Sequence, residues 1–371
     1  MDVLAAPSGD LELTRWPDDP RLQAFDAADA LLLEHLREVD LTGTLVVLND
    51  RWGALTTALA PHEPVSVSDS WVAQESARVN LARAGRQVEL RAVVDLPPER
   101  IDVLVFRVPR TVALLEHELH LLAPRLHAGS VVLGAGMVKE VHTSVLRTCE
   151  QLVGPTRTSL ATRKARLIHV RVDPTLVRPA DPWPRTIVLP ADAPAGLAGV
   201  ALSQHAGVFS AEHLDIGTRL LLEALPRFTG RVVDLGCGNG ALGVAAGLAG
   251  PHARVVLTDE SHLAVASAVA TWRGVHGERP VEAVVGDGLE GVSGPVDTVL
   301  CNPPFHVGHR VSDTTAWRMF SQARRALGTG GEMWVVGNRH LGHHARLGRL
   351  FGGCDVVASN AKFVVLRAVA R

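Results

Sequence analysis

Short apolar runs and longer amphipathic stretches alternate along the second half of the chain. The apolar runs are RVVDL (231–235), VVLTDE (255–260), DTVLC (297–301), GEMWVVGN (331–338) and KFVVLRAVA (362–370). Between them, segments such as 261–273 and 317–327 have the spacing of helices. Apolar runs separated by helical stretches are typical of a parallel sheet with helices on both faces. The pattern therefore predicts a doubly wound α/β domain.

The first half of the chain repeats this order. Its segments 44–55, 65–71, 102–110, 130–137 and 164–172 run parallel to 231–242, 255–261, 297–305, 331–338 and 362–370. In this alignment Asp69 ends the second strand of the first half, much as Asp259 ends that of the second half. A proline-rich stretch at 174–194 separates the halves and is typical of a linker or an irregular edge. We predict two doubly wound domains in tandem, over 1–184 and 185–371.

Composition narrows the class of protein but not its substrate. Hydrophobic residues make up 47% and charged residues 20% of the chain, as in soluble globular proteins. Because no apolar stretch approaches the roughly 20 residues that cross a bilayer, and the N-terminus does not resemble a secretory signal, we expect a cytoplasmic protein with no membrane partner. The widely spaced cysteines argue against a disulfide framework and against a metal site. The net charge of −2 neither demands nor excludes a nucleic-acid partner.

The two halves differ most where a ligand would bind. After its first strand the second half has the loop DLGCGNG (234–240), whereas the first half has NDRWG (49–53). The first half also has Arg-Val-Pro (107–109) where the second has Asn-Pro-Pro (302–304). Bulky side chains in such a loop keep a ligand from approaching the backbone. We therefore expect the N-terminal domain to be degenerate and the chemistry to lie in the second.

The glycine loop predicts the cofactor site. Gly236, Gly238 and Gly240 lie between a strand and a helix, at the carboxyl end of the sheet where open α/β folds bind ligands. Asp234 opens the loop, and its carboxylate can pair with the positively charged amino acid part of S-adenosylmethionine. A lone glycine loop also fits a dinucleotide, but no Walker lysine follows it here. These features favour S-adenosylmethionine, with Asp259 accepting hydrogen bonds from the ribose hydroxyls.

Several of the candidate cofactor residues have a second interpretation. Asp259 could instead cap the helix that follows it. Asp287 lies in a Gly-Asp-Gly turn and either accepts from the adenine amine or is a plain turn residue. Asp215 and Thr218 lie at the start of a helix, and they either cap it or lie over the methionine end of the cofactor. The residue pattern leaves these alternatives open.

The segment Asn302-Pro303-Pro304-Phe305 follows the fourth strand and is the candidate catalytic segment. An exocyclic amine of a base is a poor nucleophile because its lone pair is delocalised into the ring. The Asn302 side-chain oxygen and the Pro303 carbonyl can hold both N–H groups of such an amine, on a loop that the prolines stiffen. Phe305 offers a ring on which an extruded base can stack, and His306 is a further candidate for substrate contact. The rate would come from positioning and electrostatics rather than from a strong base.

Stretches between residues 13 and 371 resemble the bacterial ribosomal RNA guanine-N2 methyltransferases, most closely the large-subunit type. The matching stretches include LNDRWGAL, RVPRTVALLEHEL, VFSAEHLDIGTR, VDLGCGNGALG and LCNPPFHVGH. The resemblance implies two class I methyltransferase-like Rossmann domains, of which only the second binds S-adenosylmethionine. It also implies N2-methylguanosine as the product and a role of the first domain in RNA recognition.

The resemblance leaves the exact substrate open. We expect a monomer that acts on ribosomal RNA, naked or in an assembling subunit, with Arg339, Lys139, Arg163, Lys164 and Arg166 as candidates for contact with the RNA. A sister family methylates the small-subunit RNA, and the Asn-Pro-Pro-Phe motif also occurs in adenine-N6 and glutamine methyltransferases. A ribosome-assembly factor without catalytic activity is the alternative outside enzymes, and the intact catalytic segment argues against it.

Overall fold

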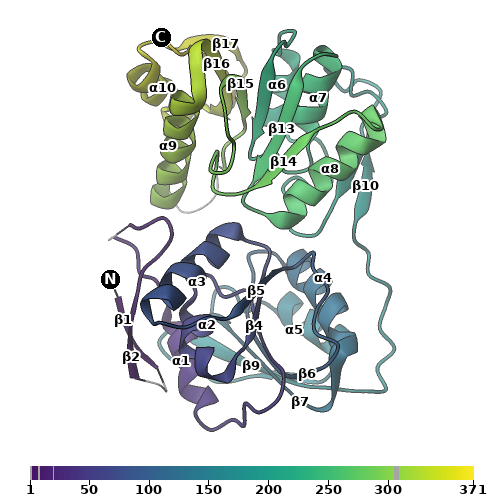
Figure 1. Ribbon diagram of the computed structural model, residues 1–371. Coiled ribbons are helices and arrows are strands. Elements are labelled where there is room, and N and C mark those ends of the chain that lie inside the picture. The colour runs from purple at the N-terminus through teal and green to yellow at the C-terminus, as the bar shows by residue number, and fades with distance from the viewer. Residues whose placement is uncertain (1, 7–8, 20, 305–308) are drawn as a thin grey trace. The chain divides into compact units, whose positions relative to one another are not determined.

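The computed structural model describes residues 2–6, 9–19, 21–304 and 309–371. The chain forms two compact units, Met1–Trp183 and Pro184–Arg371, which we call the N-terminal and the C-terminal unit. Each unit contains a seven-stranded sheet of its own (Figure 1). Helices flank each sheet, as the alternation of apolar runs and helical stretches predicts.

The sheet of the C-terminal unit has the strand order β14-β13-β12-β15-β16-β18-β17. Its strands are β12 (Arg231–Leu235), β13 (Arg254–Asp259), β14 (Glu282–Val285), β15 (Val296–Cys301), β16 (Leu327–Asn338), β17 (Asp355–Ser359) and β18 (Phe363–Val369). The strands from β14 to β16 are parallel, and β18 runs antiparallel to both of its neighbours. The first strand, β12, lies between β13 and β15, so the strand order reverses at its carboxyl end. Open α/β sheets bind their ligands at such a switch point.

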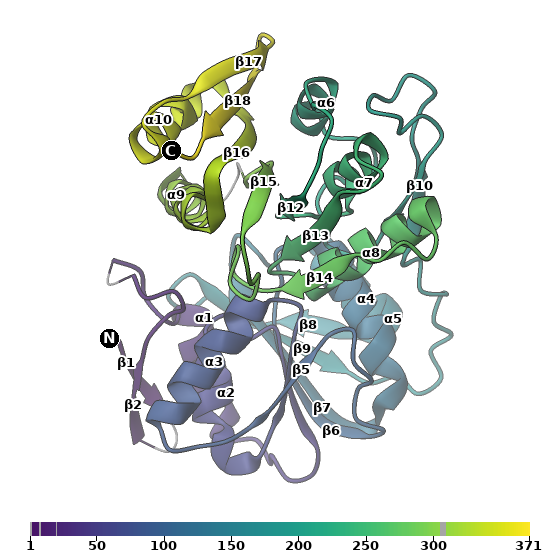
Figure 2. The ribbon, with the colours of Figure 1, turned by 45° about the horizontal axis from the view of Figure 1, so that its top comes forward.

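Helices cover both faces of this sheet (Figure 2). They are α6 (Ile216–Glu223), α7 (Ala241–Ala249), α8 (His262–His276), α9 (His309–Ala326) and α10 (His343–Phe351), with a 3₁₀ turn η3 (Arg339–Leu341). One apolar cluster joins α6, α7 and α8 to the sheet, and a second joins α9 and α10 to it. Val232 belongs to the first cluster and Val233 to the second, because successive residues of a strand point to opposite faces. A hairpin of β10 (Arg185–Val188) and β11 (Ala201–Gln204) precedes α6.

The N-terminal unit has the same topology, with the strand order β5-β4-β3-β6-β7-β9-β8. Its strands are β3 (Leu45–Leu48), β4 (Val65–Ser68), β5 (Glu89–Ala92), β6 (Ile101–Arg107), β7 (Leu126–Met137), β8 (Thr156–Thr158) and β9 (Ala165–Arg171), and a hairpin of β1 (Asp2–Ala6) and β2 (Gly9–Leu13) precedes them. Its helices are α1 (Ala27–Leu36), α2 (Ala54–Ala58), α3 (Trp71–Arg83), α4 (Val112–Leu122) and α5 (Thr143–Leu152), with 3₁₀ turns η1 (Ala60–His62) and η2 (Ala123–Arg125). The matching strand orders confirm the prediction of tandem doubly wound domains.

Strand pairing defines which positions of the two units are equivalent. The first central strand of each sheet ends in a leucine, Leu48 or Leu235. The pairing partners of these leucines are Val67 and Thr258 on one side, and Phe106 and Cys301 on the other. The residues that follow these partners are therefore equivalent too, so Arg107 stands at the position of Asn302.

The same register corrects one feature of the sequence alignment. Ser68, rather than Asp69, is the counterpart of Asp259, and Asp69 corresponds to Glu260. The alignment placed the acidic residues opposite each other, whereas the ladder of hydrogen bonds pairs positions regardless of charge. The N-terminal unit therefore lacks a carboxylate at the position expected to bind the ribose.

The structure also contains elements that the sequence pattern missed. Strands β8 and β17 add antiparallel edges to the two sheets, and α9 begins at His309 rather than at residue 317. β17 exposes Val356 and Val357, so it does not alternate between apolar and polar positions as a half-buried strand does. Within the described ranges, no helix is long and apolar enough to cross a membrane.

Candidate active site

The glycine loop turns tightly between β12 and α7. Gly236, Gly238 and Gly240 all have positive φ, at 77°, 52° and 83°, a conformation that residues with a Cβ rarely adopt. A Cβ on Gly240 would lie 2.8 Å from the Ala268 backbone, so this glycine lets α7 pack closely against α8. A Cβ on Gly238 would meet nothing within 4 Å. The loop is therefore held on one side and open on the other, as the expected cofactor site requires.

Asp234 is buried beneath this loop, and only one of its two carboxyl oxygens has a hydrogen-bond partner among the described residues. It is 1% exposed, and its Oδ2 accepts from the Gly243 N–H at 2.7 Å. Its Oδ1 is buried without a hydrogen-bond partner among the described residues. Burial raises the pKa of Asp234 to about 8, and the charge of Asp259 adds to this effect. A buried carboxyl group with a raised pKa and one oxygen free of described partners fits a cationic group of a ligand, such as the ammonium group of S-adenosylmethionine.

Asp234 is expected to make the stability of the C-terminal unit depend on pH. In the unfolded chain Asp234 has a pKa of about 3.9, whereas in the folded protein its pKa is about 8. Between these two pH values the folded state therefore binds a proton that the unfolded state has released. Stability is then lost as the pH rises, by up to about 1.4 kcal/mol per pH unit for one proton. Asp234→Asn removes this contribution, so its free energy of unfolding should fall less steeply between pH about 5 and 8. Denaturant unfolding of both proteins without cofactor measures the difference, and equal slopes would contradict the raised pKa.

Asp259 ends β13 with both carboxyl oxygens on backbone N–H groups. Oδ2 accepts from Gly238 at 3.0 Å, and Oδ1 accepts from Ser261 at 3.1 Å. The helix cap is Ser261, whose hydroxyl accepts from the Ala264 N–H at 3.0 Å. The alternative that Asp259 caps α8 is therefore wrong, because the chain needs two more residues to enter the helix. Burial raises the pKa of Asp259 to about 6.

Asn302 follows β15 and is held by two residues from the start of α6. Its Nδ2 donates to the Thr218 hydroxyl at 2.8 Å and to Asp215 Oδ2 at 3.2 Å. Its Oδ1 is buried and has no partner among the described residues. Asp215 caps α6 by accepting the Thr218 N–H at 2.8 Å, so the capping interpretation is confirmed for Asp215. Thr218 is the third residue of the helix and does not cap it.

The other candidate site residues lie in different settings. Pro303 is buried and Pro304 exposed, while Phe305 and His306 lie outside the described residues. Asp287 Oδ1 forms an ion pair with Arg318 of α9 at 2.8 Å. This pair joins the turn after β14 to α9, and contact of Asp287 with the adenine amine stays a prediction.

Arg339 is exposed at the start of η3. Its Nη1 donates to the Asn360 carbonyl at 3.0 Å, which anchors the side chain beside the turn between β17 and β18.

Two polar contacts of this site were not anticipated from the sequence. Arg318 lies on α9, and in the sequence it resembles any solvent-exposed arginine of a helix. In the structure it forms an ion pair with Asp287. Asn239 donates from Nδ2 to the buried Gln204 Oε1 at 3.0 Å, which ties the glycine loop to β11. Their partners are more than 30 residues away in the chain, at 31 and 35 positions, so no local motif signals them.

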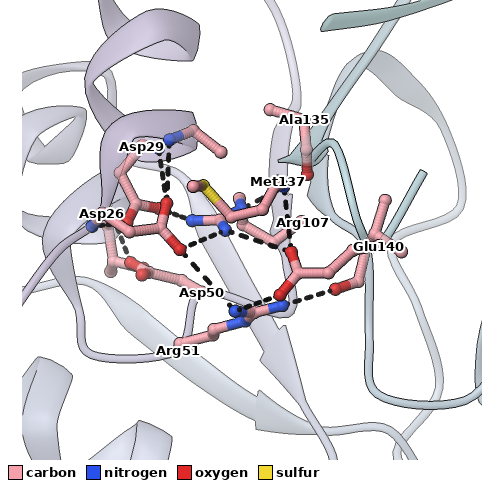
Figure 3. Close-up of polar contacts among 11 residues, drawn as sticks. Asp26, Asp29, Asp50, Arg51, Arg107, Ala135, Met137 and Glu140 are labelled. Atoms are coloured by element: carbon pink, nitrogen blue, oxygen red, sulfur yellow. Dashed lines mark hydrogen bonds and ion pairs between the residues drawn. The ribbon is translucent and has the colours of Figure 1, made fainter. Parts of the chain in front are cut away.

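The N-terminal unit has a charged cluster at the equivalent positions (Figure 3). Arg107 is fully buried where the C-terminal unit has Asn302. Its Nη1 donates to Asp29, and its Nη2 donates to Asp26 at 2.9 Å. The two carboxylates raise the pKa of Arg107 although burial opposes this, so the guanidinium stays charged.

A second arginine covers the loop of the N-terminal unit. Arg51 stands at the position of Gly238. Its Nη2 donates to the Val108 carbonyl, the counterpart of the Pro303 carbonyl, at 3.0 Å, and its Nη1 pairs with Glu140 at 3.1 Å (Figure 3). In the N-terminal unit, therefore, side chains of the unit itself form hydrogen bonds with groups whose counterparts in the C-terminal unit are expected to bind ligands.

Two family models match the chain, one in each half. Residues 1–174 match the RLMG N-terminal domain, and residues 199–367 match the methyltransferase small domain. A solved structure titled as a 16S rRNA N2 methyltransferase from T. thermophilus, in complex with AdoMet and guanosine, has a TM-score of 0.78 at 23% identity, and the match covers 100% of this chain and 98% of that one. This likeness supports the tandem fold.

Curated relatives extend the match over the full length. The ribosomal RNA large subunit methyltransferase G of Streptomyces coelicolor is 57% identical over 99% of this chain and 100% of that protein. The protein of the same name from Pseudomonas syringae pv. syringae is 46% identical over the same shares, 99% and 100%. The chain therefore belongs to the ribosomal RNA large subunit methyltransferase G family.

Proposed function

We propose that this protein transfers a methyl group from S-adenosylmethionine to the N2 amine of a guanosine in the ribosomal RNA of the large subunit. The observation that carries the proposal is the Asn302 amide, which is fixed by its nitrogen while its buried oxygen has no partner in the described part of the chain. A buried carbonyl oxygen without a donor is costly, and an amine N–H of the substrate would satisfy it. The names of the full-length relatives and of the structural neighbour support the choice of ribosomal RNA and of the guanine N2 amine.

The residues of the glycine loop fit S-adenosylmethionine. The Asp234 Oδ1, which no described residue contacts with a hydrogen bond, would accept from the ammonium group, and Asp259 would accept from the ribose hydroxyls. The open side of Gly238 leaves room for a ligand to lie against the backbone. When bound, the cofactor supplies a methyl group on a positively charged sulfur. Both acidic side chains lie where they would stabilise its positive end or its sugar.

The catalytic segment would orient the amine rather than deprotonate it. The Asn302 oxygen and the Pro303 carbonyl would accept the two N–H groups, which favours a pyramidal nitrogen with its lone pair directed at the methyl carbon. Alignment of this kind lowers the barrier because the reacting atoms no longer lose orientational freedom in the transition state. Fixed acceptors also stabilise the positive charge that develops on the nitrogen. Phe305 and His306 are proposed to contact the base.

We further propose that the N-terminal unit contacts the RNA. Lys139, Arg163 and Lys164 are exposed, and the Val138 N–H donates to the Lys164 carbonyl at 2.8 Å, which brings these basic residues together. Phosphate contacts by such residues position an RNA without reading its sequence, and they weaken with salt. Because ribosomal RNA is the proposed substrate, we also propose that the enzyme acts in the cytoplasm, as a monomer and without a membrane partner.

The test supplies tritiated S-adenosylmethionine and ribosomal RNA from an unmethylated source, followed by identification of the labelled nucleoside. The expected result is label in N2-methylguanosine of the large-subunit RNA. Label in the small-subunit RNA would assign the protein to the small-subunit activity, and label in N6-methyladenosine would overturn the substrate. Where no RNA is labelled, transfer to a protein glutamine in an assay with protein acceptors would overturn it too. Cofactor binding without transfer to any acceptor would favour the ribosome-assembly factor.

Asp259→Ala is expected to weaken S-adenosylmethionine binding by about 10- to 100-fold, because hydrogen bonds to a charged group contribute about 1.5–3 kcal/mol. Isothermal titration calorimetry measures the dissociation constant. Ser68→Ala changes the equivalent position of the N-terminal unit and should leave the affinity unaltered. An unchanged affinity in Asp259→Ala would remove the ribose assignment.

A further inference from the structure

The amide of Asn302 has two ends of nearly equal size and opposite hydrogen-bonding character. Only the oxygen end can hold an amine N–H, so the enzyme needs the amide in one of its two orientations. The nitrogen end lies 3.2 Å from Asp215 Oδ2 and 2.8 Å from the Thr218 hydroxyl. A carboxylate only accepts hydrogen bonds, so the reversed amide would place two oxygens against each other. The Asp215 carboxylate therefore selects the orientation that presents the oxygen of Asn302.

The partners of Asn302 are themselves held in place. Asp215 caps α6 through the Thr218 N–H, so the cap and the contact to Asn302 use the same carboxyl oxygen, Oδ2. A Cβ on Gly217 would lie 3.0 Å from that oxygen and 3.2 Å from the Phe363 ring, which shows how closely the helix start packs. Thr218 is only 8% exposed. The amide thus contacts two side chains that are themselves held at the start of α6.

The N-terminal unit repeats this arrangement with different chemistry (Figure 3). Asp26 caps α1 as Asp215 caps α6, and Asp29 is the third residue of α1 as Thr218 is of α6. Asp26 and Asp29 both bind Arg107, which stands at the position of Asn302. In both units, therefore, the same two positions of the helix start hold the residue at the end of the fourth central strand. A charged guanidinium takes two carboxylates, whereas the neutral amide takes one carboxylate and one hydroxyl.

We propose that Asp215 and Thr218 are positioning residues for methyl transfer, which orient the Asn302 amide toward the substrate amine. This assignment rests on the proposed function and replaces the expectation that the two residues bind the cofactor. It adds to that function the two groups that orient Asn302 for methyl transfer.

The test uses substitutions that keep the helix and remove the orienting contact. Asp215→Asn retains a good helix cap but can donate as well as accept, and Thr218→Val removes the hydroxyl at nearly constant volume. We expect each substitution to lower the turnover number about 10-fold or more and to change the dissociation constant of S-adenosylmethionine less than about twofold. Thr218→Ser keeps the hydroxyl and should retain most of the wild-type turnover. Thr111→Ala, which removes the side-chain cap of α4 in the N-terminal unit, is the matched control and should leave turnover unchanged.

A double-mutant cycle separates positioning from a general structural effect. If Asp215 acts through the amide, Asp215→Asn should cause little further loss in a protein that already carries Asn302→Ala. Full additivity of the two losses would overturn the proposal, as would normal turnover in both Asp215→Asn and Thr218→Val. Loss of cofactor affinity in these variants would contradict the proposal and favour the alternative that Asp215 and Thr218 bind the cofactor. Wild-type protein that transfers no label to any RNA would instead reject the proposed function itself, whatever the variants do.

Discussion

Replacing Asn302 with alanine is expected to lower the turnover number by about 100- to 1,000-fold, the range found when one fixed hydrogen-bonding group of an active site is removed. The Asn302 oxygen is buried, and it has no hydrogen-bond partner among the residues that the structure describes. Without it the amine would lose one of the two contacts that direct its lone pair. The dissociation constant of S-adenosylmethionine should change little, because the proposed cofactor contacts lie on Asp234, Asp259 and the glycine loop. Single-turnover kinetics with labelled cofactor, together with calorimetry, measures both quantities.

The matched control is the neighbouring position. Cys301→Ala changes a fully buried side chain beside Asn302, and burial raises the pKa of the Cys301 thiol, so the thiol is neutral and no nucleophile. Its turnover should remain within a few-fold of the wild-type value. Near-normal turnover in Asn302→Ala would remove the amine-holding mechanism, and a comparable loss in Cys301→Ala would show that the segment is merely sensitive to packing.

Arg107→Met is expected to destabilise the N-terminal unit by about 3–5 kcal/mol, because removing one partner of a buried ion pair leaves the other charges uncompensated. Arg107 is fully buried and holds the Asp26 and Asp29 carboxylates together. Burial already raises the pKa of Asp29, and loss of the guanidinium would raise the cost of its charge further. Denaturant unfolding, followed by hydrogen exchange in α1 and β6, measures the effect on this unit.

A second substitution distinguishes charge from packing. Asp29→Leu in the Arg107→Met background removes the buried carboxylate and should recover a large part of the lost stability, since apolar replacements of a whole buried pair are often neutral or stabilising. Failure to recover stability would indicate that Arg107 acts through its shape and its bond to the Ala135 carbonyl. Cofactor binding by the C-terminal unit provides an internal check that the effect is local.

Local sequence patterns predicted the fold and the candidate site. Two doubly wound sheets were predicted from the short apolar strands, the helical spacing between them and their repetition. This was possible because the pattern of apolar residues in each strand reflects which of its faces are buried. Gly236, Gly238 and Gly240 predicted a tight loop because glycine has no Cβ, and their positive φ values confirm the turn. The segment that begins at Asn302 could be identified as a candidate because its motif occupies four consecutive positions.

Tertiary structure alone decided how side chains that are distant in sequence meet. Asp215 and Asn302 are 87 positions apart, and Arg107 and Asp29 are 78 apart, so neither contact leaves a local pattern. The register of the strands made Ser68 the counterpart of Asp259, and the entry of the chain into α8 made Ser261 its cap. Hydrogen bonds and burial depend on these three-dimensional placements, whereas sequence periodicity reports only which face of an element is apolar.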